Sequence, residues 1–276
     1  MLTTTIDGLW VLQVLTGVEV LAPELGLRPH LPRVESRESA LAMPIATELA
    51  EAGAIDPDGR VDDPVAEWLT VLARRDIGLV ADLRTPEAAT PTRVLLARFA
   101  RWWAVCERVD DLIRIGPAGT STAEASATAV IGAQIERLCG TAEPAAMRPA
   151  TIDGAVLATV RGTGELRSLL DRCRLDGDQL RLLMLAADPV RSARASLVAV
   201  QSGAVAQRPT GAVVDGGAVT VIDTPEGRLL AETVRRDDRP WLIMSPGGPA
   251  AVVSAIRAML RRLPTEADWP LYRKVV

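Results

Sequence analysis

Aromatic side chains, lysine and histidine are all scarce in this sequence of 276 residues. Phenylalanine, tyrosine and tryptophan together make up 3% of the chain, so leucine, valine, isoleucine and alanine must fill most of a hydrophobic core. Lys274 is the only lysine, and arginine supplies nearly all the positive charge. The net charge of -4 argues against a nucleic-acid-binding domain, because such domains are usually basic on at least one face.

Cysteines and long apolar runs are also few. Cys106, Cys139 and Cys173 are odd in number and far apart, which excludes a disulfide framework and a paired CxxC redox or zinc site. Apolar runs such as residues 182–187 are far shorter than the ~20 residues of a membrane-spanning helix. The N-terminus has no basic region followed by an apolar one, so we expect no signal peptide. These absences predict a cytoplasmic protein without stable membrane insertion.

His30 is the only histidine, which restricts acid–base and metal chemistry. It lies in the proline-bracketed segment RPHLP, where we expect a surface histidine at a turn. A Ser-His-Asp or Cys-His arrangement would have to use this one residue. The paired carboxylates Asp110-Asp111 and Asp237-Asp238 lie between strand patterns, where aspartate favours turns. We therefore predict no catalytic residues, no metal site and no cofactor, and so no enzyme.

Two glycine-containing segments are weak candidates for a nucleotide site. Residues 116–121, GPAGTS, precede a predicted helix but lack the lysine of a P-loop. Residues 161–167, RGTGELR, begin like the GxGxxG fingerprint but carry arginine in place of the third glycine, and no strand precedes them. Both segments are predicted to be entrances to helices instead.

The N-terminal half has a helix followed by strands. Asp63-Pro64 offers a helix start, with proline at the first helical position and apolar residues recurring at helical spacing after it. The pattern then predicts a strand at 77–83, a proline-punctuated loop at 85–91, one long strand at 93–108, a short strand at 112–115 and a helix that ends near Leu138.

The C-terminal half repeats this order. The capping box DGDQ at 176–179 opens a helix over 178–187. The final helix carries one apolar stripe that must cover a sheet or another helix. The stripe consists of Val252, Val253, Ile256, Met259, Leu260 and Leu263. The other predicted elements are a helix at 164–173 and strands at 195–201, 218–223, 228–234 and 241–244.

These patterns predict an α+β fold in which helices, an antiparallel meander and a covering helix occur twice. We expect a mixed α/β arrangement with two pseudo-two-fold-related halves, residues 1–145 and 146–276, in a single domain spanning 1–276. Each half would be an antiparallel meander with flanking helices. The alternative is that similar hairpin turns arose independently in the two halves.

The helix predicted over 178–187 has more apolar surface than one core-facing side needs. Leu180, Leu183, Met184 and Ala187 share one face, while two further leucines lie off it. A helix that is apolar on more than one side is buried either in the core alone or also against a partner. We therefore predict these four residues as partner-binding residues.

The segment around Trp102-Trp103 is a second candidate surface. Consecutive side chains of a strand point to opposite faces, so at most one of the two rings faces a ligand while the other packs inside. We add Arg98 and Trp102 to the predicted partner-binding residues.

Several motifs resemble the EspG family of mycobacterial type VII (ESX) secretion-associated proteins. Residues 52–73, AGAIDPDGRVDDPVAEWLTVLA, follow that family's order of glycine, aspartate, proline and tryptophan before the first sheet. The segments Thr4-Thr-Ile-Asp-Gly-Leu-Trp10 and Ile222-Asp-Thr-x-x-Gly-Arg228 are also similar to the family, as is Ser245-Pro-Gly followed by a helix and Leu263-Pro264. The resemblance covers essentially the whole chain and is closest to the branch encoded at the second ESX locus.

The resemblance implies a cytosolic chaperone that binds the PPE protein of a PE–PPE heterodimer and keeps it soluble for secretion. It also implies a mixed α/β fold with pseudo-two-fold halves and a C-terminal helical bundle. In the family the partner contacts the central sheet, an inter-strand loop (here 85–92) and that bundle. The alternative function is a non-catalytic adaptor or regulatory domain with a small-molecule pocket. The sequence leaves self-association open.

Overall fold

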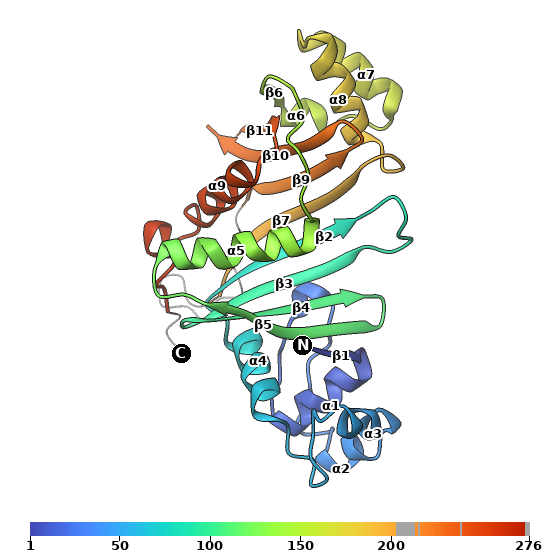
Figure 1. Cartoon of the computed structure of the whole chain (residues 1–276), viewed down its shortest axis with the longest axis vertical. Helices are drawn as coiled ribbons and strands as arrows, with labels where there is room; N and C mark the ends of the chain where they lie inside the picture. Colours follow the sequence, from blue (N-terminus) through green and yellow to red (C-terminus); the bar gives the residue numbers. More distant parts are fainter. Residues whose placement is uncertain (203–212, 215, 238, 274–276) are drawn as a thin grey trace.

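A single antiparallel sheet runs through the computed structural model, which describes residues 1–202, 213–214, 216–237 and 239–273 (Figure 1). Across these residues the sheet has 11 strands in the order β1-β5-β4-β3-β2-β7-β9-β10-β11-β6, with β8 paired to β7. The strands are β1 (Leu2–Thr5), β2 (Ile77–Arg84), β3 (Thr92–Phe99), β4 (Trp102–Val109), β5 (Leu112–Thr120), β6 (Ala150–Asp153), β7 (Ala193–Gln201), β8 (Val213–Val214), β9 (Ala218–Thr224), β10 (Gly227–Arg236) and β11 (Arg239–Pro246).

The two halves of the chain join at the pair β2–β7. Their antiparallel register runs from Ile77 opposite Gln201 to Arg84 opposite Arg194. On either side of this pair, β2 to β5 and β9 to β11 are joined as antiparallel hairpins, while the edge strands β1 and β6 pair with β5 and β11. The sheet is therefore continuous from one half to the other.

Helices pack on both faces of the sheet (Figure 1). Among the described residues, no helix combines the length and the apolar character needed to cross a membrane. The α-helices are α1 (Ile6–Thr16), α2 (Arg37–Leu41), α3 (Pro44–Glu51), α4 (Asp63–Arg74), α5 (Glu124–Cys139), α6 (Gly154–Leu157), α7 (Thr163–Arg172), α8 (Gly177–Ala187) and α9 (Pro249–Leu260), and two 3₁₀ turns lie at Pro23–Leu25 and Glu266–Asp268.

One face of the sheet is covered at its centre by α5 and α9, which lie against each other (Figure 1). The stripe predicted on α9 is buried here apart from Val253, which is partly exposed, and Ile256, Met259 and Leu260 have no exposed surface. They pack in one cluster with Val219 and Val221 of β9. The covering role predicted for this helix is confirmed.

The opposite face is covered at its two ends by separate groups of helices. The first group, α1 to α4, packs on β3, β4 and β5 through residues such as Leu12, Leu69 and Leu72. The second group, with α7 and α8, packs on β9, β10 and β11 through residues such as Leu170 and Leu182. These groups lie at opposite ends of the molecule (Figure 1).

Two sequence predictions about the N-terminal meander are wrong. Residues 93–108 form the hairpin β3–β4, not one strand, and the turn at Ala100 has φ = 58°. Residues 116–119 belong to β5, not to a helix entrance, and α5 begins at Glu124. A β-bulge between Trp103 and Ala104 bends this part of the sheet. By contrast, residues 161–167 do lead into α7, whose N-cap is Gly162.

The aspartate turns are confirmed where the structure describes them. Asp110 and Asp237 directly follow strands β4 and β10 and have φ of 51° and 50°, in the left-handed region that aspartate tolerates. Asp111 lies in the same turn as Asp110 and is exposed. Asp238 and Lys274 lie outside the described residues.

Arg228 gives the motif Ile222-Asp-Thr-x-x-Gly-Arg228 a structural role. Its guanidinium is only 3% exposed and forms a bidentate pair with Asp223, at 2.6 Å and 2.8 Å. It also donates to the carbonyls of Cys139 (2.7 Å) and Gly140 (3.0 Å) at the end of α5. The hydrogen bonds that Arg228 donates to the Asp223 carboxylate raise the pKa of Arg228. The motif thus fastens the β9–β10 hairpin to a helix of the other half.

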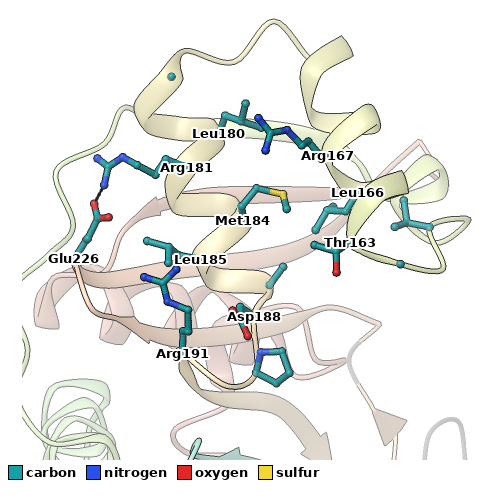
Figure 2. A pocket seen from close by; sticks show the side chains of 15 residues that line it. Thr163, Leu166, Arg167, Leu180, Arg181, Met184, Leu185, Asp188, Arg191 and Glu226 are labelled. Atoms are coloured by element: carbon teal, nitrogen blue, oxygen red, sulfur yellow. Dashed lines mark ion pairs between the residues drawn. The ribbon is translucent and has the colours of Figure 1, made fainter.

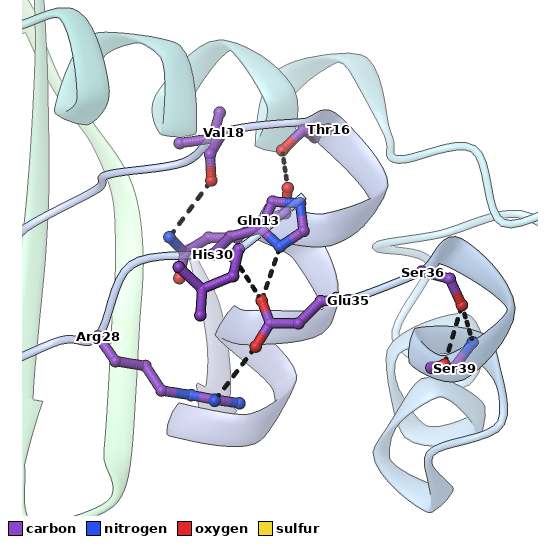
Figure 3. A network of polar contacts seen from close by, with 9 residues as sticks. Gln13, Thr16, Val18, Arg28, His30, Glu35, Ser36 and Ser39 are labelled. Atoms are coloured by element: carbon purple, nitrogen blue, oxygen red, sulfur yellow. Dashed lines mark hydrogen bonds and ion pairs between the residues drawn. The ribbon is translucent and has the colours of Figure 1, made fainter. Parts of the chain in front are cut away.

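His30 is buried, so the prediction of a surface histidine is wrong. Its side chain is 4% exposed, and its Nδ1 lies 2.8 Å from Oε2 of Glu35 (Figure 3). The same carboxylate accepts hydrogen bonds from the backbone N–H of Leu31 (2.7 Å) and from Arg28 (3.2 Å). The hydrogen bond from Leu31 is the largest cause that lowers the pKa of Glu35 to about 2. His30 and Glu35 therefore stabilise the loop before α2 through hydrogen bonds between its own residues.

Replacing this carboxylate should give a pH-dependent loss of stability. We expect Glu35→Gln to cost about 1–2 kcal/mol near neutral pH, because it removes charge-assisted hydrogen bonds. The folded-state pKa of about 2 lies below the ordinary value of 4.5, so this stabilisation is complete above pH 4.5 and is lost as the pH falls towards 2. Urea unfolding of both proteins between about pH 7 and pH 3 should show the difference narrowing on acidification. If the difference in unfolding free energy between the two proteins did not change with pH, the Glu35 carboxylate would not be the source of this stabilisation.

Candidate partner-binding site

The helices α7 and α8 form a hairpin on the end of the sheet. The Asp176 carboxylate caps α8 by accepting from the backbone N–H of Gln179 (2.8 Å), and the Gln179 side-chain oxygen accepts from the backbone N–H of Asp176 (2.9 Å). This is the predicted capping box, and the backbone hydrogen bond lowers the pKa of Asp176. The Gln179 amide also donates to the carbonyls of Arg148 and Pro149, just before β6. The start of α8 is thereby fixed to the sheet edge.

A groove with a volume of about 920 Å³ opens along the outer side of this hairpin (Figure 2). Its walls come from α7, α8, the loop that follows α8 and the turn between β9 and β10. It is lined by Val160, Gly162, Thr163, Leu166, Arg167, Gly177, Leu180, Arg181, Met184, Leu185, Ala187, Asp188, Pro189, Arg191 and Glu226.

Apolar side chains of the two helices meet inside the groove. Figure 2 shows Met184 of α8 extending towards Leu166 of α7, with Leu180 one helical turn away on the same side of α8. Both Leu166 and Leu180 are partly buried against the core of this half. The groove therefore offers a strip of aliphatic and thioether surface, the type that adapts to a partner's side chains.

Charged groups of both signs surround this strip. Arg181 forms an ion pair with Glu226 of the β9–β10 turn (Figure 2) and another with Asp178 one turn earlier, at 3.1 Å. Arg167 and Arg191 also line the groove. The ion pair with Glu226 connects α8 to the sheet, and the arginines leave the rim polar.

The structure divides the residues predicted on α8 between two environments. Leu180, Met184 and Ala187 line the groove and keep exposed surface. Leu183 is 6% exposed and packs in the core with Leu170 and Leu229. Leu183 is thus a core residue in this structure.

Arg98 and Trp102 also differ in burial, since one is in the core and the other is at the surface. Arg98 has no exposed surface, and its guanidinium donates to the backbone carbonyls of Pro270 and Tyr272 (2.8 Å for the latter). Trp102 is 45% exposed, while the neighbouring Trp103 is buried and donates to Ser121 at 2.8 Å. Trp102 lies on β4 and is far from α8, so the predicted residues do not form one surface (Figure 1).

Of the residues that line the groove, the sequence analysis predicted only Leu180, Met184 and Ala187 and missed the others. Leu166 could have been found, because it precedes Leu169 and Leu170 at helical spacing. Arg191 and Glu226 come from loops and reach the groove only through the tertiary fold. Across the residues described by the structure, no three histidine, cysteine, aspartate or glutamate side chains are placed to hold a metal ion.

This chain is similar to known proteins in both sequence and fold. The model of the EspG family matches residues 5–258. The ESX-2 secretion-associated protein EspG2 of Mycobacterium tuberculosis is 48% identical over 277 residues, with full coverage of both chains. The ESX-5 secretion-associated protein EspG5 of M. tuberculosis is 24% identical and covers 99% of this chain.

A solved structure has the same fold. The type VII secretion system chaperone EspG5 of M. tuberculosis, in complex with the PE25–PPE41 dimer, superposes with a TM-score of 0.72. The match has 22% sequence identity and covers 96% of this chain and 97% of the other. The family match, the full-length relative and the shared α+β architecture lead to one conclusion. The chain belongs to the EspG family of ESX secretion-associated proteins.

Proposed function

We propose that this protein is a cytoplasmic chaperone that binds the PPE protein of a PE–PPE heterodimer and keeps it soluble for ESX type VII secretion. It acts by binding and not by catalysis. The observation that supports the proposal most directly is the fold, which matches over 96% of the chain a chaperone solved in complex with a PE–PPE dimer.

The groove between α7 and α8 supplies a physical reason for binding at this end of the molecule. A secretion client that exposes an apolar helical surface aggregates unless that surface is covered. Leu166, Leu180 and Met184 provide apolar cover, and the arginines at the rim provide polar contacts. A few such central anchors usually account for most of the binding energy of an interface. We assign Leu180, Met184 and Ala187 to the client-binding surface.

We further infer that the two halves, residues 1–145 and 146–276, are related by a pseudo-two-fold axis between β2 and β7. The strand order supports this. From one edge of the sheet to its centre the order is β1-β5-β4-β3-β2, and from the other edge to the centre it is β6-β11-β10-β9-β7, so corresponding strands occupy corresponding positions. Each outer strand leads into a helix through the same tetrapeptide, Thr-Ile-Asp-Gly, at residues 5–8 and 151–154. The helices α6 to α8 then form the helical bundle of the second half.

A charge placed in the groove should weaken client binding without unfolding the chaperone. We expect Met184→Arg to reduce the affinity for a PE–PPE heterodimer by about 2 kcal/mol, or roughly thirtyfold, because it places a cation on the apolar strip. Calorimetric titration with co-purified PE–PPE pairs of the source genome measures the effect, and circular dichroism checks folding.

Two further variants control this test. Val34→Arg adds the same charge to an apolar side chain that is 80% exposed at the other end of the molecule, so it should bind like the wild type. Leu183→Arg places the charge in the core and should unfold the protein. Folded Met184→Arg protein with wild-type affinity would remove the groove from the interface. Absence of binding by the wild type to every pair would overturn the chaperone proposal itself.

A further inference from the structure

A second cleft, of about 630 Å³, lies between α4 and the ends of strands β3 to β5. It is separate from the groove of α7 and α8, because the two sites are at opposite ends of the sheet (Figure 1). Its size is within the range of small-molecule and side-chain binding pockets. Nothing in the proposed chaperone function uses it.

The lining of this cleft is aromatic in a chain that has few aromatic residues. Trp68 of α4, Phe99 of β3 and Trp102 of β4 all contribute to it, and Phe99 is the only phenylalanine in the sequence. Trp102 is 45% exposed, so its ring is accessible to a ligand in the cleft. Aromatic rings at such density are typical of binding sites.

The charged groups that line the cleft are all acidic. Asp63 and Glu67 of α4 belong to it, and no arginine does, although arginine is the main cation of the chain. Asp63 already pairs with Arg60 at 3.0 Å. Within the described part of the chain, Glu67 has no ion-pair partner and is exposed. The cleft therefore presents aromatic faces together with an available negative charge.

The Trp102 ring already has a guanidinium group close to it. The guanidinium carbon of Arg101, which is not part of the cleft lining, lies 4.7 Å from the centre of the Trp102 ring. A cation held at that distance from an indole is attracted by the negative face of the ring. The same attraction, with a carboxylate nearby, would act on an arginine side chain that enters the cleft.

We propose that this cleft binds an arginine side chain from a basic, partly apolar segment of a partner protein. The guanidinium stacks on Trp102 and pairs with Glu67, while the apolar stem and neighbouring residues contact Phe99 and Trp68. Arginine fits this site better than lysine, because its planar, weakly hydrated head stacks on aromatic rings. The segment that binds here is distinct from the client surface that binds in the α7–α8 groove. It belongs either to another protein or to another region of the same client.

The test uses the full-length protein alone and two short peptides. The probe is acetyl-Ala-Leu-Arg-Leu-Ala-amide, and its control carries citrulline, which has nearly the same shape but no charge, in place of arginine. Two-dimensional NMR follows the indole N–H signals of the tryptophans during titration. We expect the arginine peptide to move the Trp68 and Trp102 signals saturably, with a Kd of about 1 mM, and the citrulline peptide to bind about tenfold more weakly.

Variants then locate the binding. Trp102→Leu keeps an apolar side chain but removes the ring and should weaken arginine-peptide binding about fivefold, and Glu67→Gln should weaken it similarly while reducing its dependence on salt. Glu48→Gln, an exposed glutamate on α3, should leave binding unchanged. No saturable shift up to about 10 mM, equal binding of the citrulline peptide, or full binding by folded Trp102→Leu protein would each overturn the proposal. None of these outcomes depends on PE–PPE binding.

Discussion

Ile256→Asp should leave little or no folded protein. The Ile256 side chain has no exposed surface, and it lies where α9 covers β9 and meets the cluster beneath α5. A carboxylate there loses its water without gaining a partner, which costs several kcal/mol, and the lost apolar contacts add to that cost. The sum reaches a large part of the roughly 5–15 kcal/mol by which a domain of ordinary stability is folded. Urea unfolding followed by circular dichroism measures it.

A matched control is available on the same helix. Ser254→Asp introduces the same charge two residues earlier, on the exposed face of α9, and should change the free energy of unfolding by about 0.5 kcal/mol or less. Soluble Ile256→Asp protein with the stability of Ser254→Asp would mean that α9 does not cover the sheet in solution.

The elements that the sequence predicts well are those with one buried face. The apolar residues of α9 recur at helical spacing along its buried side, and this spacing can be seen without a structure. The capping box at Asp176 and Gln179 is equally visible, because it depends on residues only three apart. In each case the structure depends on residues that are close together in the chain, so the sequence pattern alone reveals it.

The helix α1 has no such signal, and the sequence analysis did not identify it. Seven consecutive residues, from Gly8 to Val14, are buried, so the helix is surrounded and has no polar face. Periodicity cannot identify a helix that is buried on all sides. The local clues were the caps, namely Thr5, which accepts from the N–H of Gly8 at 3.2 Å, and Gly17 at the C-terminal end with φ = 71°.

The binding site shows a similar limit. On α8, Leu180 and Leu183 share an apolar face in the sequence pattern, yet only Leu180 lines the groove. The boundary between core and surface depends on where β9 and α7 lie, which α8 alone does not encode. Glu226, which pairs with Arg181 across the groove, is 45 residues away in the chain, and only the fold brings the two together.

The missed turn between β3 and β4 leads to a buried charge cluster. Ala100 and Arg101 are not typical turn residues, so nothing local predicts the turn. Its backbone is held from outside, because the Ala100 N–H donates to the Asp76 carboxylate at 3.0 Å. Asp76 has no exposed surface, and the Arg273 guanidinium lies 3.4 Å from the same carboxylate. Asp76 therefore stabilises a turn and the C-terminal segment at once.

Asp76 also supplies the negative charge for Arg98. Burial lowers the pKa of Arg98 to about 10, and the nearby Asp76 opposes this effect. Arg98 holds the carbonyls of Pro270 and Tyr272, so the cluster ties the end of the chain to β3. Removing one charge from such a cluster strands the other in the interior, which usually costs more than removing both.

Asp76→Ala should therefore destabilise the protein by about 3–5 kcal/mol, the usual cost of leaving a buried charge without its partner. Asp76→Asn should cost less, because the amide oxygen still accepts from the Ala100 N–H while the charge is lost. The decisive measurement is a double-mutant cycle with Arg98→Met, in which urea unfolding gives the free energy of all four proteins. If the stranded guanidinium causes the loss, Asp76→Ala costs at least about 1 kcal/mol less in the Arg98→Met background than in the wild type. Strict additivity would show that the two residues stabilise the fold independently, with Asp76 acting through the turn at Ala100 alone.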